Sequence, residues 1–294
     1  MSRPTPAIAA FLVACLGVAM YSVMDVVMKG LVLGIGVYSA VAWRNLAGAV
    51  IAGAIWGLSR PTMPSRAALR LHLWRGVIVT FMSLLFFYSI AVLPIAEAIA
   101  LSFIAPLIGL FLAAVLLKEK VQPSSIAASL LGLAGVGVIV WSRLGDASEG
   151  GADPRVSLAI AAVLFSAVLF AYNLILTRQQ ALAAKPGEIA FFQTITVVGV
   201  LLIAAPWFAI LPDRADWPLL LLSAVLSVAA LYLFGWAYSR GEAQLLIPTE
   251  YTAFAWAALC GWLFFDEEVT LPVLVGTGLI VSGSLIVARA QTRA

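Results

Sequence analysis

Leu117-Lys118-Glu119-Lys120-Val121 closes one long apolar run of the sequence, and Phe265-Asp266-Glu267-Glu268-Val269 closes another 148 positions later. At this offset or the next one, further pairs of similar or equivalent residues are Tyr88/Trp236, Phe103/Tyr251, Gly135/Gly283, Lys29/Arg178 and Arg44/Gln193. A spacing that persists across half of the chain indicates an internal duplication.

The composition requires lipid as the solvent. Of 294 residues, 63% are hydrophobic and only 11% are charged, with a mean hydropathy of +1.08. A soluble domain carries about 25% charged residues, so this chain is expected to bury most of its length in a bilayer. The net charge of +3 fits cytoplasmic loops rich in Lys and Arg and gives no reason to expect a nucleic-acid partner.

A transmembrane helix needs about 20 apolar residues, and ten segments satisfy that rule. We predict spans near 7–29, 36–58, 73–92, 95–117, 123–142, 156–177, 188–210, 217–239, 243–265 and 269–288. The predicted fold class is therefore an all-α integral membrane protein with ten transmembrane helices.

The duplication divides these spans into two halves of five. We predict an N-terminal repeat over 1–143 and a C-terminal repeat over 155–294, joined by the polar linker 144–154. Because five is odd, the second half enters the membrane from the opposite side. Such inverted repeats place a substrate site at their interface near the bilayer midplane.

The loop charges predict the orientation. With the N-terminus in the cytoplasm, about twelve Lys and Arg residues face inward, Arg75 among them, and about four face outward. By the positive-inside rule, both termini are expected in the cytoplasm of a bacterial inner membrane. A monomer and a homodimer both remain open.

Ionisable side chains within the spans are costly and usually functional. In the outer half we expect a cluster of Asp25, Lys29, Arg44 and Glu97, with Tyr21 one turn before Asp25. Asp25 and Lys29 share a helix face and can pair. The cluster is either a structural ion-pair group or an outer gate in which Arg44 binds a substrate carboxylate.

The inner half carries mostly neutral polar groups, namely Asn173 and Gln193, together with Glu250. They are either polar contacts between helices or an inner gate. Asp25, Lys29, Glu97, Gln193 and Glu250 form the predicted gating or proton-sensitive set.

Pro106 interrupts the fourth span and should free the carbonyl of Ser102, so Ser102 and Phe103 are expected to border a cavity. Tyr251 occupies the position that matches Phe103. The full set predicted to bind substrate is Tyr21, Arg44, Ser83, Ser102, Phe103, Tyr172, Asn173, Trp236 and Tyr251.

Other chemistries find little support in the sequence. His72 is the single histidine, and Cys15 and Cys260 are far apart, so we expect no metal site, no cofactor and no enzyme activity. No nucleotide-binding fingerprint is present, and no row of like polar groups indicates a channel.

The chain resembles the drug/metabolite transporter superfamily, in its ten-helix bacterial exporter branch. The resemblance rests on the duplicated halves, on Ala98 to Pro106 leading into Leu117-Lys118-Glu119, and on the Gly-rich segments 132–137 and 276–283. It implies a secondary transporter for small molecules, most similar to exporters of aromatic and other neutral amino acids. A sugar-phosphate or nucleotide-sugar exchanger is the alternative, and a membrane-embedded enzyme is a weaker one.

Overall fold

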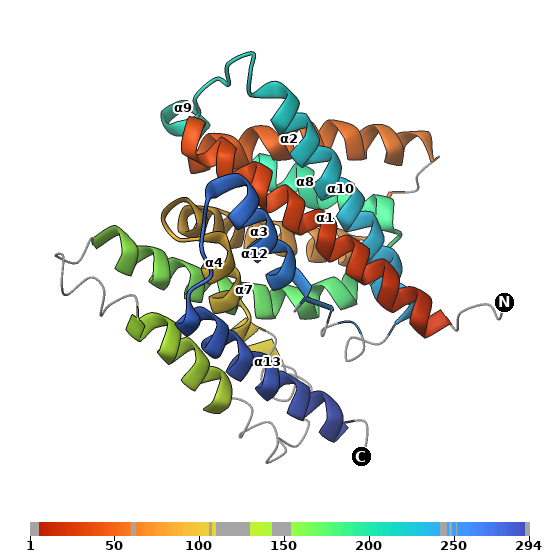
Figure 1. The fold of residues 1–294 in the computed structure, drawn as a ribbon. Coiled ribbons are helices and arrows are strands. Elements are labelled where there is room, and N and C mark those ends of the chain that lie inside the picture. Colours follow the sequence, from red (N-terminus) through yellow and green to blue (C-terminus); the bar gives the residue numbers. More distant parts are fainter. Residues whose placement is uncertain are drawn as a thin grey trace.

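A computed structural model describes residues 6–59, 63–105, 108–109, 130–142, 154–241, 246, 249–250 and 252–291. Across these residues the secondary structure is helical, with short turns and connections (Figure 1). The helices are α1 (Pro6–Ile35), α2 (Val37–Leu58), α3 (Arg66–Val92), α4 (Ile95–Ser102), Leu130–Ser142, α7 (Pro154–Ala183), α8 (Pro186–Leu202), α9 (Ala205–Phe208), α10 (Trp217–Arg240), α12 (Thr252–Phe265) and α13 (Leu271–Gln291).

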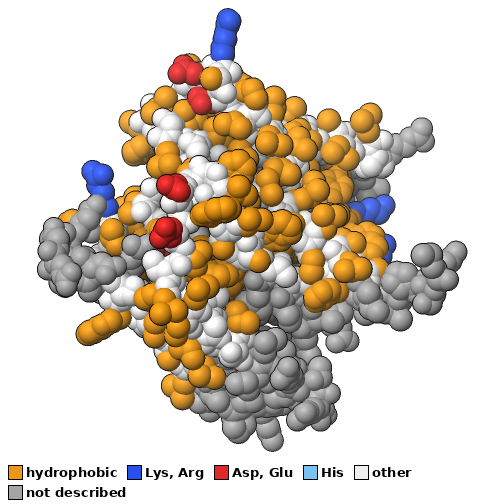
Figure 2. Space-filling view, in the orientation of Figure 1, with side chains coloured by type: hydrophobic (Ala, Val, Ile, Leu, Met, Phe, Trp, Pro, Cys, Tyr) orange, Lys and Arg blue, Asp and Glu red, His pale blue; other side chains and the backbone are white. Residues whose placement is uncertain are grey.

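Each described helix falls on one of the ten predicted spans, and the single turn of α9 lies within the end of the seventh. Five of them, α1, α2, α3, α7 and α10, are long and apolar enough to cross a membrane by themselves. Apolar side chains cover most of the face in Figure 2, while the Lys and Arg side chains visible there lie at its periphery. The all-helical membrane fold predicted from hydropathy is therefore confirmed.

Helix packing follows the internal duplication. The most extensive contacts are α1 with α10 and α3 with α7, and α2 packs on α8 (Figure 1). Exchanging α1 with α7, α2 with α8, and α3 with α10 converts the first contact into the second and leaves the third unchanged. The fold thus consists of two related halves that interlock, as inverted repeats do. The exact boundaries 1–143 and 155–294 remain a prediction.

Glycines bring the two halves together at the last helices of each. A Cβ added to Gly135 would overlap the carbonyl oxygen of Gly276, so Leu130–Ser142 and α13 cross at very short range. Only small residues permit such an approach between membrane helices. These glycines act as scaffold within one chain.

Several helices end or begin at other residues than predicted: α1 runs on to Ile35 rather than ending near residue 29, and α7 to Ala183 rather than near residue 177. The third helix begins at Arg66 rather than near residue 73, because Ser65 caps it by accepting a hydrogen bond from the Ala68 amide at 3.2 Å. The seventh span, predicted as 188–210, ends at Leu202, and Pro206 follows within the single turn of α9. The predicted role of Pro106 lies outside the described residues.

Candidate binding cavity

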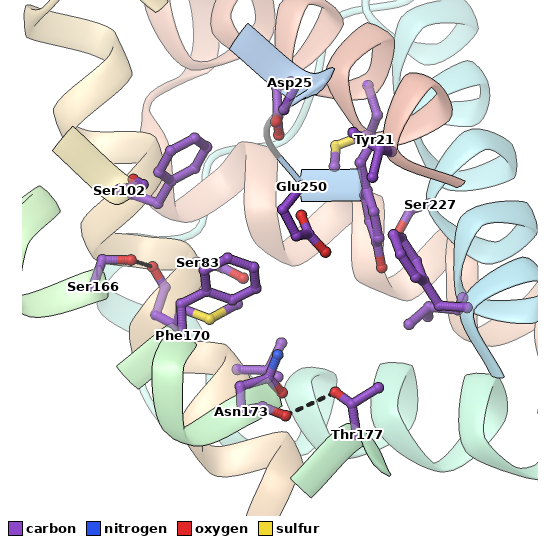
Figure 3. Close-up of a pocket in the computed structure, with 18 of the residues that line it drawn as sticks. Tyr21, Asp25, Ser83, Ser102, Ser166, Phe170, Asn173, Thr177, Ser227 and Glu250 are labelled. Carbon is purple, nitrogen blue, oxygen red and sulfur yellow. Dashed lines mark hydrogen bonds between the residues drawn. The ribbon is translucent and has the colours of Figure 1, made fainter. Parts of the chain in front are cut away.

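A cavity of about 220 Å³ lies between the two halves, lined by residues from α1, α2, α3, α4, α7, α8, α10 and the start of α12 (Figure 3). Drug-sized ligands occupy pockets of roughly 300–1,000 Å³, so this cavity suits a small metabolite. Its wall is mainly apolar, with a few polar groups that converge on the same space.

Much of the cavity wall follows the duplication. Many lining residues form pairs 148 or 149 positions apart, each pair occupying matching positions of the two halves. Examples are Val18/Ala167, Tyr21/Phe170 and Arg44/Gln193. The cavity therefore surrounds the approximate two-fold axis that relates the repeats, which is where inverted-repeat transporters bind substrate.

Arg44 is a buried cation of this cavity and carries an unused donor. The side chain is 6% exposed, its Nη1 donates to Met24 Sδ at 3.1 Å, and its guanidinium lies 5.2 Å from the centre of the Phe87 ring. Its Nε has no hydrogen-bond partner within the described part of the chain. Because a buried charge is costly unless paired, this arrangement can accommodate an anionic group.

Two carboxylates, Asp25 and Glu250, also line the cavity, and Figure 3 shows both beside Tyr21. The ion pairs found between described residues involve neither of them. Asp25 comes from α1, and Glu250 lies in a short 3₁₀ turn that precedes α12. The site therefore combines the Arg44 side chain, which is suited to an anion, with two side chains suited to a cation.

Aromatic rings supply much of the remaining wall. Tyr21 stacks on Phe234 with ring centroids 5.6 Å apart, and Phe103 lies 6.4 Å from Phe254. Phe86 and Phe170 also line the cavity. These rings give the site an apolar surface beside the charged groups, as ligand pockets commonly have.

The structure brings together most residues of the predicted set and leaves others outside the cavity. Tyr21, Asp25, Arg44, Ser83, Ser102, Phe103, Asn173, Gln193 and Glu250 all line it. Lys29, Glu97, Tyr172 and Trp236 do not. Tyr172 accepts a hydrogen bond from exposed Trp74, Trp236 stacks against Arg240, and Glu97 is buried at the start of α4. Tyr251 lies outside the described residues.

The expected pairing of Asp25 with Lys29 is corrected by the structure. Lys29 forms an ion pair with Glu267 and donates to the Leu93 carbonyl oxygen at 2.9 Å. Glu267 also accepts from the Ile95 amide at 2.8 Å. We call Lys29, Leu93, Ile95 and Glu267 the outer polar cluster, after the side of the membrane predicted for Lys29 from the loop charges, and it joins the N-terminal half to the C-terminal half.

The turn after α12 places Glu267 in that cluster. Asp266 adopts a positive φ of 55°, a conformation that Asp tolerates better than most residues. The Glu267 amide then donates to the Gly261 carbonyl at 3.1 Å, and its carboxylate lies close to Gly261. The local conformation of Asp266-Glu267 thus ends α12 and directs the Glu267 carboxylate to the outer polar cluster.

The sequence prediction missed a second buried polar group, because it began the third span after His72 and counted Arg75 among the cytoplasmic charges. Both are buried within α3, with exposed fractions of 1% and 4%. His72 bonds to Glu188 and Gln180, while Arg75 bonds to Gln180 and Asn173. We call these five residues the inner polar network. The cap residue Ser65 was the sequence signal that could have lengthened the helix to include them.

A helical membrane protein whose two inverted halves share a central cavity of mixed polarity has the architecture of a membrane transporter. The EamA-like transporter family model matches residues 8–141 and again 157–289. The chain belongs to this family, and the expected membership of the drug/metabolite transporter superfamily is confirmed.

Relatives of known or partly known function agree with this assignment. A riboflavin transporter of Rhizobium johnstonii is 28% identical, over 76% of this chain and 71% of its own. The pseudopaline exporter CntI of Pseudomonas aeruginosa is 26% identical over 95% of this chain and 96% of its own. A solved protein structure covers 98% of this chain and 99% of its own with a TM-score of 0.66 and 20% identity, which supports the fold. Both the family and these relatives indicate a transporter rather than an enzyme.

Proposed function

We propose that this protein is a secondary transporter that exports neutral metabolites bearing a carboxylate, with aromatic or apolar amino acids as the preferred substrates. The observation that carries the proposal is the unpartnered Nε of buried Arg44 in a cavity with an aromatic wall. The alignment with the exporter CntI, which extends over 95% of this chain, supports export as the direction of transport.

In this proposal the charged groups bind the two ends of a zwitterion. Arg44 binds the carboxylate through charge-assisted hydrogen bonds. Asp25 or Glu250 binds the ammonium group. The apolar side chain of the substrate packs against Tyr21 and Phe234, which are already stacked on each other.

Alternating access would use the two polar groups at the ends of the cavity. The outer polar cluster links α1 to the turn after α12, and the inner polar network links α3 to α7 and α8. When one half rocks against the other, either the outer polar cluster or the inner polar network breaks, while the second set of contacts stays intact. The substrate site between them stays approximately fixed.

The proposed location is the bacterial inner membrane, with both termini in the cytoplasm. Reporter fusions test this topology: a phosphatase active only outside the cytoplasm should be inactive at the C-terminus, and a fluorescent protein there should mature. The reverse pattern would contradict the orientation.

Counterflow tests the function directly. Purified protein in liposomes loaded with an unlabelled amino acid should accumulate the same labelled amino acid transiently, with L-phenylalanine and L-leucine as first probes. Protein-free liposomes are the control. Absence of exchange for every neutral amino acid would remove the proposed substrate class, and repeating the assay with an imposed pH gradient would reveal proton coupling.

Arg75 favours a second candidate, a sugar-phosphate or nucleotide-sugar exchanger. Such substrates carry more than one negative charge and need at least two basic groups at depth. Arg75 is 4% exposed and lines the cavity together with Arg44. If this candidate is correct, hexose phosphate should exchange in counterflow and L-phenylalanine should not.

A further inference from the structure

The inner polar network is a continuous chain of hydrogen bonds that ends on a cavity residue. His72 Nε2 lies 2.9 Å from the Glu188 carboxylate, and His72 Nδ1 lies 2.8 Å from the Gln180 amide nitrogen. The Gln180 oxygen accepts from Arg75 Nη1, and Arg75 Nε donates to Asn173 Oδ1 at 2.8 Å. Three helices, α3, α7 and α8, contribute to it.

The donors and acceptors in this chain fix the protonation of His72. A guanidinium only donates, so the oxygen of Gln180 must face Arg75 and its NH₂ group must face His72. His72 Nδ1 must then accept, and it carries no proton. The single imidazole proton therefore lies on Nε2, from which it is donated to Glu188.

The same bonds hold Arg75 in a defined position. Asn173 and Gln180 occupy Nε and Nη1, while Nη2 has no hydrogen bond to the part of the chain that is described. Arg75 lines the cavity. Two of its three nitrogens are therefore anchored to α7, and the third is left for a ligand in the cavity.

We propose that His72 and Gln180 are positioning residues that hold Arg75 as a second anion contact of the cavity. When a proton binds to His72 Nδ1, Arg75 loses its hydrogen bond to Gln180 and is no longer held in that position. The proposal rests on the proposed transport function and assigns Arg75 to the carboxylate of the substrate when it enters from the cytoplasmic side. With Nδ1 protonated, two donors oppose each other. Gln180 must then turn its oxygen to His72 and its NH₂ group to Arg75, so Arg75 loses its acceptor.

The neighbours of His72 are few and each is accounted for. Glu188 approaches from α8, where the Phe192 ring also stacks on the imidazole at 5.2 Å. The neutral amide of Gln180 approaches from α7, and Arg75 lies on the same helix as His72. In the described residues, α1, α2 and α4 place no ionisable side chain in hydrogen-bond contact with His72.

The protonation state can be read without any transport assay, because His72 is the one histidine in the sequence. Protein labelled with ¹⁵N-histidine, prepared with a histidine-free tag and placed in nanodiscs, should give one pair of imidazole nitrogen resonances. At neutral pH we expect Nε2 to be protonated and Nδ1 to be unprotonated. In Gln180→Glu the carboxylate cannot donate, so Nδ1 should carry a proton. A protonated Nδ1 in the wild type, or an unchanged spectrum in Gln180→Glu, would overturn the proposal.

Counterflow of labelled L-phenylalanine then measures the consequence for the substrate. Lowering the pH on the cytoplasmic face should raise the KM of the wild type about tenfold, the scale of one charge-assisted hydrogen bond. His72→Asn keeps an acceptor for Gln180 and cannot gain the proton, so its KM should change with pH clearly less than that of the wild type, retaining only the part contributed by the cavity carboxylates Asp25 and Glu250. In Gln180→Glu the KM should fall, rather than rise, as the cytoplasmic pH is lowered. Arg75→Gln should have a raised KM at every pH.

Arg70→Gln is the matched control, since Arg70 is an exposed cation on the same helix, and it should retain the wild-type profile. If Gln180→Glu also keeps the wild-type profile, the positioning role is refuted. If the wild type transports no amino acid, the substrate proposal fails and the NMR result alone decides whether the network has the predicted proton arrangement.

Discussion

The two halves of the cavity have matching backbones and different chemistry. At matching positions, Arg44 of the N-terminal half corresponds to Gln193 of the C-terminal half, and Asp25 corresponds to Leu174. All four side chains line the same space. The duplicated helices provide a geometry that can rock about a fixed site, while the unequal side chains give the site one preferred orientation of its ligand.

The closest ionic link between the halves should give the largest effect when broken. Replacing Lys29 by Met leaves the partly buried Glu267 without its cation, and removing one partner of a buried ion pair costs at most about 3–5 kcal/mol. Thermal unfolding in detergent should show a large drop in Tm. The double variant Lys29→Met/Glu267→Met should regain most of the loss, and equal losses in single and double variants would contradict the pairing.

Making the two halves alike at one position tests the asymmetry itself. Arg44→Gln gives both halves a glutamine, and the loss of a charge-assisted hydrogen bond to the substrate predicts a fall in kcat/KM of about 10- to 100-fold. Counterflow of L-phenylalanine measures it. Arg44→Lys should keep part of the activity. A change in protein yield alone, with unchanged kinetics, would make Arg44 structural.

The contact between the last helices of the halves can be tested with a matched pair of glycines. Gly276→Ala introduces a Cβ that overlaps Gly135 and Ile139, and overpacking costs about 1–3 kcal/mol. Gly278→Ala, on the same helix, meets nothing within 4 Å. Tm should fall for the first variant and stay near the wild-type value for the second, and equal behaviour would argue against the crossing.

The smallest effect is expected just outside the cavity. Tyr172→Phe removes a hydroxyl that accepts a hydrogen bond from exposed Trp74, and such peripheral changes usually stay within about 0.5 kcal/mol. Counterflow rates should change by less than about twofold. Asn173→Ala, one residue further along, should cost more because Asn173 holds Arg75. A larger effect at Tyr172 would place it in the substrate path.

Hydropathy and repeat spacing were sufficient to predict the fold. Membrane helices must form their backbone hydrogen bonds internally, so each one requires a long apolar segment that is visible in the sequence. They also placed Arg44 and Gln193 at matching positions of the two halves, and both residues line the cavity. The face of each helix that points into the cavity was harder to predict, since neighbouring residues such as Tyr172 and Asn173 lie at a similar height along the helix but face different directions.

Long-range partners were the main omission. Lys29 and Glu267 are 238 positions apart, so no local pattern could join them, and the nearer Asp25 was the natural choice on the same helix face. His72 and Arg75 were lost for another reason. Their polarity argued against a membrane span at this point of the sequence. In the structure, hydrogen bonds to partners on α7 and α8 offset the cost of burying them.

The central claim is that one paired cavity serves as the substrate site and opens to each side in turn. Ser227, a small cavity residue on α10, can be replaced by Cys after Cys15 and Cys260 are changed to Ala. A membrane-impermeant thiol reagent, applied separately to each face of oriented vesicles, should label this cysteine from both faces, and L-phenylalanine should slow labelling from both. Labelling from one face only, or labelling that no substrate slows, would contradict the account.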